Sequence, residues 1–503
     1  MDWLIDSLRV VREVRDWAAA RRRRDAGATA TREALETASR ELEAYARERG
    51  WTDPEPVTRL VEPLGPARGR SVDTTPTTAE AEPRTEEARV RVEDIDPQAI
   101  SAVKRLRRYG YKGYLVGGCV RDLLLGITPK DFDIATDARP EEVKAVFRNS
   151  RIIGRRFRLV HLYFRGGKVL EVATFRAAAV SDEDEEGNGD LLIRRDNVFG
   201  TEQEDAQRRD FTINALFYDP ESGHIIDHVG GLADIDARVV RMIGDPDIRL
   251  REDPVRIVRA IRFRAKAGLT LEPGLEAALG RHVEDLVRCP PARLLEETLK
   301  LLRMGHARAA FDEMLVHDVV AVLLPEVQAF LAGHLSLLAG AEVMEGRDPL
   351  ADMRAHLEGL DRIAERGNVG DDVILGALLY PMAEAVMDHA DDRGRDRNKA
   401  VSELLGLVGV RVQITRRIAE QLRQAFTVQR HFVPEGPSGA RRRRRMSPST
   451  LVRRSFFSTA LRIYEVHQRA IGGSLDEVEA WERRAADEGV GVELPLAPEV
   501  PDR

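Results

Sequence analysis

A glycine pair followed by two closely spaced carboxylates constrains this chain more than any other feature. Gly117 and Gly118 open the segment GGCVRD, and Asp131 and Asp133 follow it in the segment KDFD. The apolar residues after them predict a short strand over 131–135, and alternate residues of a strand share a face. Two carboxylates on one face repel each other unless cations neutralise them. The pattern therefore favours a site for divalent cations.

The elements expected around this segment point to phosphate chemistry. The patterns predict a helix over 97–109, a strand over 114–116, the glycine turn, a helix over 120–125 and then the acidic strand. Glycines let backbone N–H groups approach a phosphate, and magnesium prefers carboxylate and phosphate oxygens. A glycine pair or an acidic pair alone is usually an ordinary turn. In this order they favour nucleotidyl transfer assisted by two metal ions.

Length and composition set wide limits. The chain has 503 residues, enough for two to four domains, and 43% apolar with 32% charged residues predicts a soluble globular protein. The net charge of −7 is unevenly distributed, so local charge says more about nucleic-acid binding than the total. Cys119 and Cys289 fit a reducing compartment. Because we find neither a signal peptide nor a long apolar run, we expect a cytoplasmic protein.

Composition divides the chain into segments of different character, and the fold class expected from them is α+β. We expect a small mixed-sheet head and then a mostly α-helical neck, body and tail, with no strand after about residue 249. The segments are a helical N-terminal extension at 1–52, a Pro/Glu-rich disordered linker at 53–95, the head at 96–228, the neck at 229–295, the body at 296–432, an arginine-rich tail at 433–487 and a flexible C-terminus at 488–503. Within the head, strand-like runs cover 158–164 and 169–175, and an acidic insert occupies 181–190.

Glu171 is a third carboxylate of interest because it lies in the apolar run LEVA. A charged group in such a strand is costly unless it is paired or binds a metal. Glu171 could therefore complete an acidic triad with Asp131 and Asp133. An edge-strand glutamate that faces water explains the residue equally well.

The segment RRDFTIN combines charge and apolar character in an unusual way. Arg208 and Arg209 suit a triphosphate, because a guanidinium binds phosphate oxygens in a planar fork. Asp210 could orient these arginines or assist the metal site, and Asn214 could read a ribose hydroxyl. A salt-bridge cluster at the start of a helix is the alternative.

The segment REDPVRIVRAIR carries a second set of charges. Arg256, Arg259 and Arg262 recur every three residues and should share one side of a helix. Asp253 could accept from an exocyclic amine while Arg256 donates to a ring nitrogen. Adenine and cytosine offer that combination, so the pair predicts ATP or CTP. An ordinary helical salt bridge between the two residues is the alternative.

These motifs resemble the class II nucleotidyltransferases, the family of bacterial poly(A) polymerases and CCA-adding tRNA nucleotidyltransferases. GGCVRDLLLG with DFD, RRDFTINA, REDPVRIVRAIRF and CPPARLLEETLKLL follow the family order over about residues 96–305. The resemblance implies a head, neck, body and tail, with magnesium bound by the first two aspartates. It assigns catalysis to Asp131, Asp133 and Asp210, the triphosphate to Gly118, Arg121 and Arg209, and the nucleotide pocket to Asp253, Arg256, Arg259 and Arg262. It leaves open whether Glu171 or Asp210 is the third acid.

The segment IIGRRFRLVHL resembles the signature of the poly(A) polymerase branch. Its arginines, Arg155, Arg156 and Arg158, suit contact with RNA or triphosphate, and the run of Arg441, Arg442, Arg443, Arg444 and Arg445 resembles a basic RNA-binding tail. The resemblance implies template-independent addition of AMP from ATP to RNA 3′ ends. A CCA-adding enzyme is the nearest alternative. An inactive RNA-binding protein is another, although such a protein needs no acidic pair beside its RNA.

Overall fold

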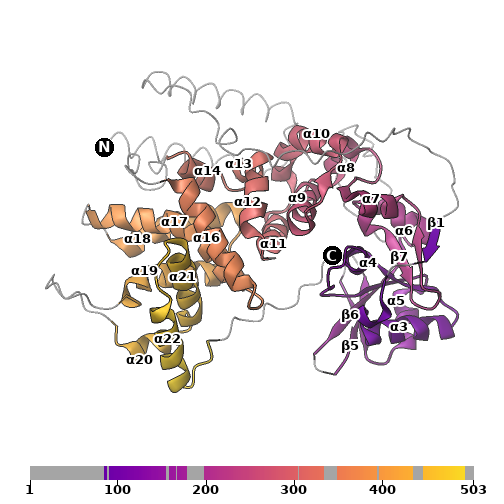
Figure 1. The fold of residues 1–503 in the computed structure, drawn as a ribbon, viewed down its shortest axis with the longest axis horizontal. Helices are drawn as coiled ribbons and strands as arrows, with labels where there is room; N and C mark the ends of the chain where they lie inside the picture. Colours follow the sequence, from indigo (N-terminus) through magenta and orange to yellow (C-terminus); the bar gives the residue numbers. More distant parts are fainter. Residues whose placement is uncertain are drawn as a thin grey trace.

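The computed structural model describes residues 84–87, 90–154, 158–165, 167–177, 198–303, 305–333, 348–392, 396–433 and 446–492. Figure 1 shows a sheet-containing head at one end, helices at the other, and a helical neck between them. The predicted fold class is therefore confirmed. The predictions for residues 1–52, for the insert at 181–190, and for Arg155, Arg156 and Arg441–Arg445 lie outside the described ranges.

The head is built on a mixed eight-stranded sheet in the order β1-β8-β7-β2-β3-β6-β5-β4. The strands are β1 (Arg84–Glu87), β2 (Gly113–Val116), β3 (Asp133–Thr136), β4 (Ser150–Ile153), β5 (Leu159–Tyr163), β6 (Val169–Thr174), β7 (Leu216–Asp219) and β8 (His224–Asp227). β3 and β6 run parallel, and the other neighbouring pairs in this sheet are antiparallel. The acidic strand β3 is therefore central, between β2 and β6.

Helices of the head cover this sheet. They are α3 (Pro97–Arg108), α4 (Gly118–Leu124), α5 (Pro140–Val146) and α6 (Glu202–Arg208). In α3, Ala99, Ala102, Val103 and Leu106 are buried, and this spacing gives one apolar stripe. The Asp96 carboxylate caps the same helix by accepting from the backbone N–H groups of Gln98 and Ala99.

Part of the head differs from the sequence prediction. Residues 84–87 of the expected linker form β1, which pairs with β8 at the edge of the sheet. Their sequence, RTEE, has no apolar residue, so only the available sheet edge reveals the strand. β4, β7 and β8 were also not predicted. The acidic strand begins at Asp133, so Asp131 lies just before it rather than within it.

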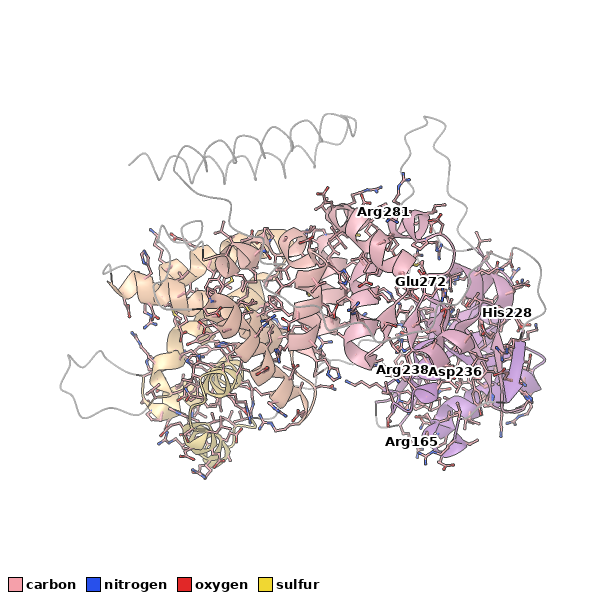
Figure 2. The ribbon with its side chains drawn as sticks, turned by 45° about the horizontal axis from the view of Figure 1, so that its top comes forward. Arg165, His228, Asp236, Arg238, Glu272 and Arg281 are labelled. Carbon is pink, nitrogen blue, oxygen red and sulfur yellow. The ribbon has the colours of Figure 1, made fainter. Side chains whose placement is uncertain are left out.

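The neck contains α7 (Gly231–Ala237), α8 (Pro246–Glu252), α9 (Arg256–Ala267), α10 (Pro273–His282) and α11 (Pro291–Leu302). β10 (Thr270–Leu271) pairs with β9 (Val239–Val240), so the expectation of no strand after residue 249 was wrong. A two-residue strand is too short to show a period of two. Figure 2 labels three residues of this region: Arg238 just before β9, Glu272 just after β10, and Arg281 in α10.

The body and tail are helical throughout their described residues. Their helices are α12 (Ala307–Val316), α13 (Val319–Leu323), α14 (Pro325–Leu331), α16 (Pro349–Ala364), α17 (Asp371–Asp392), α18 (Arg397–Val412), α19 (Arg416–Val428), α20 (Pro448–Val452), α21 (Phe457–Ala470) and α22 (Asp476–Asp487). Among the described helices, α17 alone is long and apolar enough to cross a membrane, but 83% of its apolar window is buried inside the protein. It is therefore a core helix of the body.

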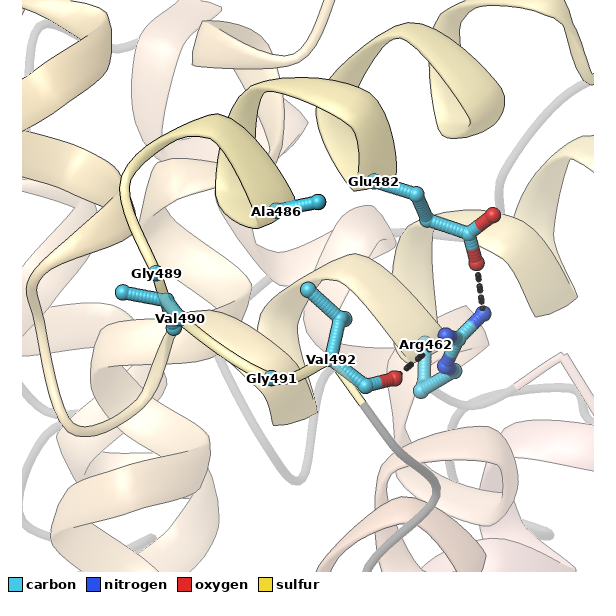
Figure 3. A pocket seen from close by; sticks show the side chains of 7 residues that line it. All are labelled: Arg462, Glu482, Ala486, Gly489, Val490, Gly491 and Val492. Atoms are coloured by element: carbon cyan, nitrogen blue, oxygen red, sulfur yellow. Dashed lines mark hydrogen bonds and ion pairs between the residues drawn. The ribbon is translucent and has the colours of Figure 1, made fainter.

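A pocket of about 450 Å³ lies in the tail, and Figure 3 shows its lining. Arg462 of α21 donates from Nη1 to Glu482 and from Nη2 to the Val492 carbonyl oxygen. These contacts fasten the last described residues to α21. The pocket contains none of the residues that the sequence motifs selected, and those residues lie in the head and neck.

Candidate active site in the head

The strand register brings the acidic pair next to the glycine turn. Val116 at the end of β2 pairs with Asp133 at the start of β3, and Gly117 follows Val116 directly. Asp131 and Asp133 are partly exposed, whereas Phe132 between them is buried. This burial pattern agrees with the predicted placement of both carboxylates on one side of the chain, which stays a prediction because Asp131 lies before the strand.

Gly117 is required by the geometry of this turn. Its φ of 78° lies in the left-handed region, and a Cβ at this position would lie 3.2 Å from Nη1 of Arg209. The turn therefore brings the backbone and the Arg209 guanidinium close together. Burial, and then the nearby Asp133 carboxylate, raise the pKa of Cys119 to about 12, which keeps this thiol neutral beside the turn.

Glu171 lies beside the acidic pair on a central strand. The parallel register places Ile134 next to Val172, so Asp133 and Glu171, each one residue earlier, are neighbours. Glu171 Oε1 lies 2.9 Å from Nε2 of His161 on β5. The edge-strand explanation for this glutamate is therefore wrong, because β6 lies between β3 and β5.

Arg121 is held inside the head rather than at its surface, with only 3% of its area exposed. Its Nη1 donates to Oδ1 of Asn214 at 2.8 Å, while Nε and Nη2 donate to Asp122. Its guanidinium also lies over the Phe263 ring of α9, 4.6 Å from the centroid. These contacts fix Asn214 and join the glycine-turn helix to the neck. The predicted contact of Arg121 with the triphosphate stays a prediction.

Asp210 connects the head to the neck through a buried ion pair. Its Oδ2 accepts from Nε of Arg259 at 2.7 Å, and its Oδ1 accepts from the Phe211 N–H and from Nδ2 of Asn214. Burial favours the neutral acid, but Arg259 and these hydrogen bonds outweigh it and lower the pKa of Asp210 well below its usual range. Asp210 is therefore charged and holds α9 against the RRD segment.

Asp253 and Arg256 are anchored by different partners and do not form the helical salt bridge that was the alternative to base recognition. Asp253 follows the end of α8, and Arg256 begins α9. The Asp253 carboxylate accepts hydrogen bonds from Nη1 and Nη2 of Arg293, at 2.9 and 2.7 Å. Nη1 of Arg256 donates to the Arg249 carbonyl oxygen at 2.7 Å and lies 3.4 Å from Glu252. Each residue thus has its own support, and the i, i+3 salt bridge between them is replaced by these contacts.

Arg259 and Arg262 of the neck both lie near one carboxylate that the sequence motifs had not indicated. Glu297 of α11 lies 3.4 Å from Arg262 and 3.9 Å from Arg259. Glu297 lies inside the motif CPPARLLEETLKLL, which pointed to this part of the chain. The sequence alone could not identify the arginines that contact it. In the head, Arg158 forms an ion pair with Glu141.

Within the described ranges, no three His, Cys, Asp or Glu side chains gather closely enough to hold a metal ion. Asp131 and Asp133 still fit magnesium, which commonly binds one or two carboxylates and takes its other ligands from water and substrate phosphates. Their hard oxygen ligands and partial exposure suit that arrangement.

Comparison with known proteins agrees with this geometry. Residues 113–241 match the model of the poly A polymerase head domain, and residues 268–331 match "Probable RNA and SrmB- binding site of polymerase A". The poly(A) polymerase I of Salmonella typhi is 44% identical over 307 residues, which cover 60% of this chain and 64% of that protein. The poly(A) polymerase I of Haemophilus influenzae is 36% identical over 349 residues, 67% of this chain and 74% of that protein.

Among solved structures, the Bacillus stearothermophilus CCA-adding enzyme in complex with CTP has a TM-score of 0.50 and 25% identity, covering 78% of this chain and 82% of that one. The fold and the matching family model define a head of the poly A polymerase type on a helical neck and body. The chain belongs to the poly(A) polymerase family. It spans just under two thirds, 64%, of the length of the Salmonella relative.

Proposed function

We propose that this protein is a template-independent poly(A) polymerase that transfers AMP from ATP to the 3′ end of RNA. The observation that carries the proposal is the register of β2 and β3, which brings two partly exposed carboxylates to a glycine turn beside Arg209. The similarity to poly(A) polymerase I of Haemophilus influenzae over 349 residues supports it. The cytoplasm, which holds RNA and ATP, is the compartment that we propose.

In this proposal Asp131 and Asp133 hold two Mg²⁺ ions. When bound, magnesium lowers the pKa of the attacking 3′-hydroxyl and neutralises charge on the triphosphate. The backbone N–H of Gly118 donates to phosphate oxygens, since the Gly117 N–H already donates to the Leu216 carbonyl oxygen, and Arg209 beside the turn binds the same phosphates. The protein thus mainly positions the hydroxyl for in-line attack on the α-phosphate. Glu171 and Asp210 then support the neighbouring groups, Glu171 beside Asp133 and Asp210 through Arg259.

Asp253 and Arg256 read the base in this proposal. The carboxylate accepts from the adenine amine and the guanidinium donates to a ring nitrogen. We expect Arg256→Ala to reduce the preference for ATP over GTP and UTP about tenfold or more, because the base loses a hydrogen-bond partner. Incorporation rates of the four nucleoside triphosphates on one RNA measure this effect. Unchanged ratios would contradict the assignment.

A CCA-adding enzyme is the second candidate, since the Bacillus stearothermophilus CCA-adding enzyme shares the fold. The test compares products from each triphosphate on oligo(A) and on a tRNA that lacks its CCA end. We expect long tails on oligo(A) with ATP alone. Addition of CMP to the tRNA, ending after CCA is complete, would favour the second candidate. RNA binding without any addition would favour an inactive binding protein.

The RNA partner is proposed to contact Arg155, Arg156 and Arg158 in the head and Arg441–Arg445 in the tail. Arg158 is paired with Glu141 in the structure, so RNA would have to compete with this exposed ion pair. Exposed pairs contribute little, about 0–1 kcal/mol, so such a competition is feasible.

A further inference from the structure

A carboxylate outside the predicted site lies beneath two of the predicted phosphate-binding arginines. Asp205 of α6 has only 2% of its area exposed. Its Oδ1 accepts from Nε of Arg208 at 2.9 Å. Its Oδ2 accepts from Nε and Nη2 of Arg209, at 3.2 and 2.8 Å. One buried group thus fixes two guanidiniums that lie next to each other in the sequence.

Asp205 also ties this helix to the central sheet. Its Oδ1 accepts the backbone N–H of Arg176 at 3.2 Å, just after the end of β6. Thr201 and Glu204 cap the start of α6 through reciprocal hydrogen bonds. Burial opposes ionisation, but Arg209 and Arg208 outweigh it and lower the pKa of Asp205. The carboxylate is therefore charged, and α6 is capped at its start and tied to the sheet through Asp205.

The side chains of both arginines remain partly accessible. Their side chains are 22% and 20% exposed, although Asp205 itself is almost fully buried. Nη1 of Arg209 donates to the Asn214 carbonyl oxygen at 3.3 Å and faces Gly117. Asp205 therefore contacts Nε of Arg208 and the Nε–Nη2 edge of Arg209, while Nη1 of Arg209 lies beside the glycine turn.

We propose that Asp205 is a positioning residue that orients Arg208 and Arg209 toward the nucleotide's phosphates and so sets the preference of the site for a triphosphate over a monophosphate. The inference rests on the proposed function and deepens it. Arginine side chains have much rotamer freedom, and ordering them before the ligand arrives removes that cost from binding. Asp205 should then affect the contribution of the β- and γ-phosphates and leave base and ribose recognition unchanged.

The test measures equilibrium binding of AMP, ADP and ATP to the full chain in magnesium. In Asp205→Asn the amide keeps the volume, but it loses the charge and turns a donor toward the arginines. We expect the ratio of ATP to AMP affinity to fall about tenfold or more, since charge-assisted hydrogen bonds are the strong ones, while AMP affinity is retained. An equal loss for all three nucleotides would show a merely structural role and overturn the inference, as would an unchanged ratio.

Asp219→Asn is the matched control. Asp219 is also largely buried and pairs with an arginine, Arg107, at 2.9 Å. The register of β2 and β7 places it at the end of the sheet away from Gly117. This variant should keep the wild-type ratio of ATP to AMP affinity. The same fall in both variants would contradict a specific role for Asp205.

Asp205→Glu keeps the inference testable if the asparagine variant does not fold. It retains the charge but lengthens the side chain by one methylene, which displaces both guanidiniums. We expect a severalfold fall in the ratio with AMP binding retained, and a wild-type ratio would refute the inference. Wild-type protein that binds AMP as tightly as ATP would instead refute the proposed function. The two failures are therefore distinguishable.

Discussion

The head and the tail each bury a carboxylate surrounded by arginines, yet the surroundings of the two differ. Asp205 in α6 holds Arg208 and Arg209, and Nη1 of Arg209 lies beside Gly117 in the glycine turn. Glu465 in α21 accepts from Arg366, Arg462 and Arg469, and it has 1% of its area exposed. The chemistry of the two clusters is nearly the same.

The difference lies in what the arginines reach. Among those around Glu465, Arg366 follows the end of α16, and Arg462 contacts Glu482 and the Val492 carbonyl oxygen, which are packing contacts of the tail. Of those around Asp205, Arg209 reaches the glycine turn, whose neighbouring residue Val116 pairs with the partly exposed Asp133. A buried ion cluster therefore does not identify a site. The accessible groups next to it decide whether it supports chemistry or only holds helices together.

The largest expected effect is in the head. Asp131→Ala or Asp133→Ala should reduce AMP addition at least about a thousandfold, because metal-assisted charge stabilisation contributes several kcal/mol. Thermal unfolding and RNA binding should change little, since both side chains are partly exposed. Primer-extension rates at saturating ATP and magnesium measure the effect. Near-normal rates would place the site elsewhere.

Removing Glu465 from the tail cluster should lower stability and leave nucleotide binding unchanged. Glu465→Ala leaves three arginines around a buried site without their carboxylate, and breaking such a cluster costs about 3–5 kcal/mol of stability. Urea unfolding should therefore begin at lower denaturant concentration, while the ATP to AMP affinity ratio stays at the wild-type value below the transition. A changed ratio would mean that the two clusters are not functionally distinct.

Acid should weaken the helical region through His356. Burial first, opposed by the hydrogen bond with the Asp352 carbonyl oxygen and reinforced by nearby His467, lowers the pKa of His356 to about 4. The unfolded chain, with a pKa near 6.5, takes up the proton first as the pH falls. Stability should therefore decline between about pH 6.5 and 4, by roughly 3 kcal/mol at most.

Urea unfolding at several pH values measures this decline, and His356→Phe removes the titrating group. The wild type should lose stability more steeply than the variant between pH 6.5 and 4. Parallel curves would contradict a buried neutral histidine. The head site should keep its ATP to AMP affinity ratio over the upper part of this range.

The smallest expected effect concerns Arg441–Arg445, which lie outside the described ranges. Replacing all five with alanine should weaken RNA binding and make its salt dependence shallower, because each lost phosphate contact removes about 0.7 from the log–log slope on single strands. The rate of first AMP addition at saturating RNA should hardly change. Fluorescent oligo(A) titrated at several salt concentrations gives the slopes, and identical slopes would mean that this run does not contact RNA.

The sequence by itself determined the elements and residue types whose signals are local. The helix over 97–109 and the segments GGCVRD, DFD and RRDFTIN were all predicted without a structure, because periodicity and clustered charge act over a few residues. The sequence also indicated a strand beginning in the acidic segment, although β3 begins at Asp133 rather than at Asp131.

Only the tertiary structure decided which distant groups meet. In the structure, RTEE pairs with β8 and β9 pairs with β10. Asp210 forms an ion pair with Arg259, and Asp253 pairs with Arg293 rather than with Arg256. A charged residue in a sequence has many possible partners, and a strand has many possible neighbours. Packing removes most of these options, because a buried charge or an open strand edge is stable only where a complementary group lies within hydrogen-bonding distance.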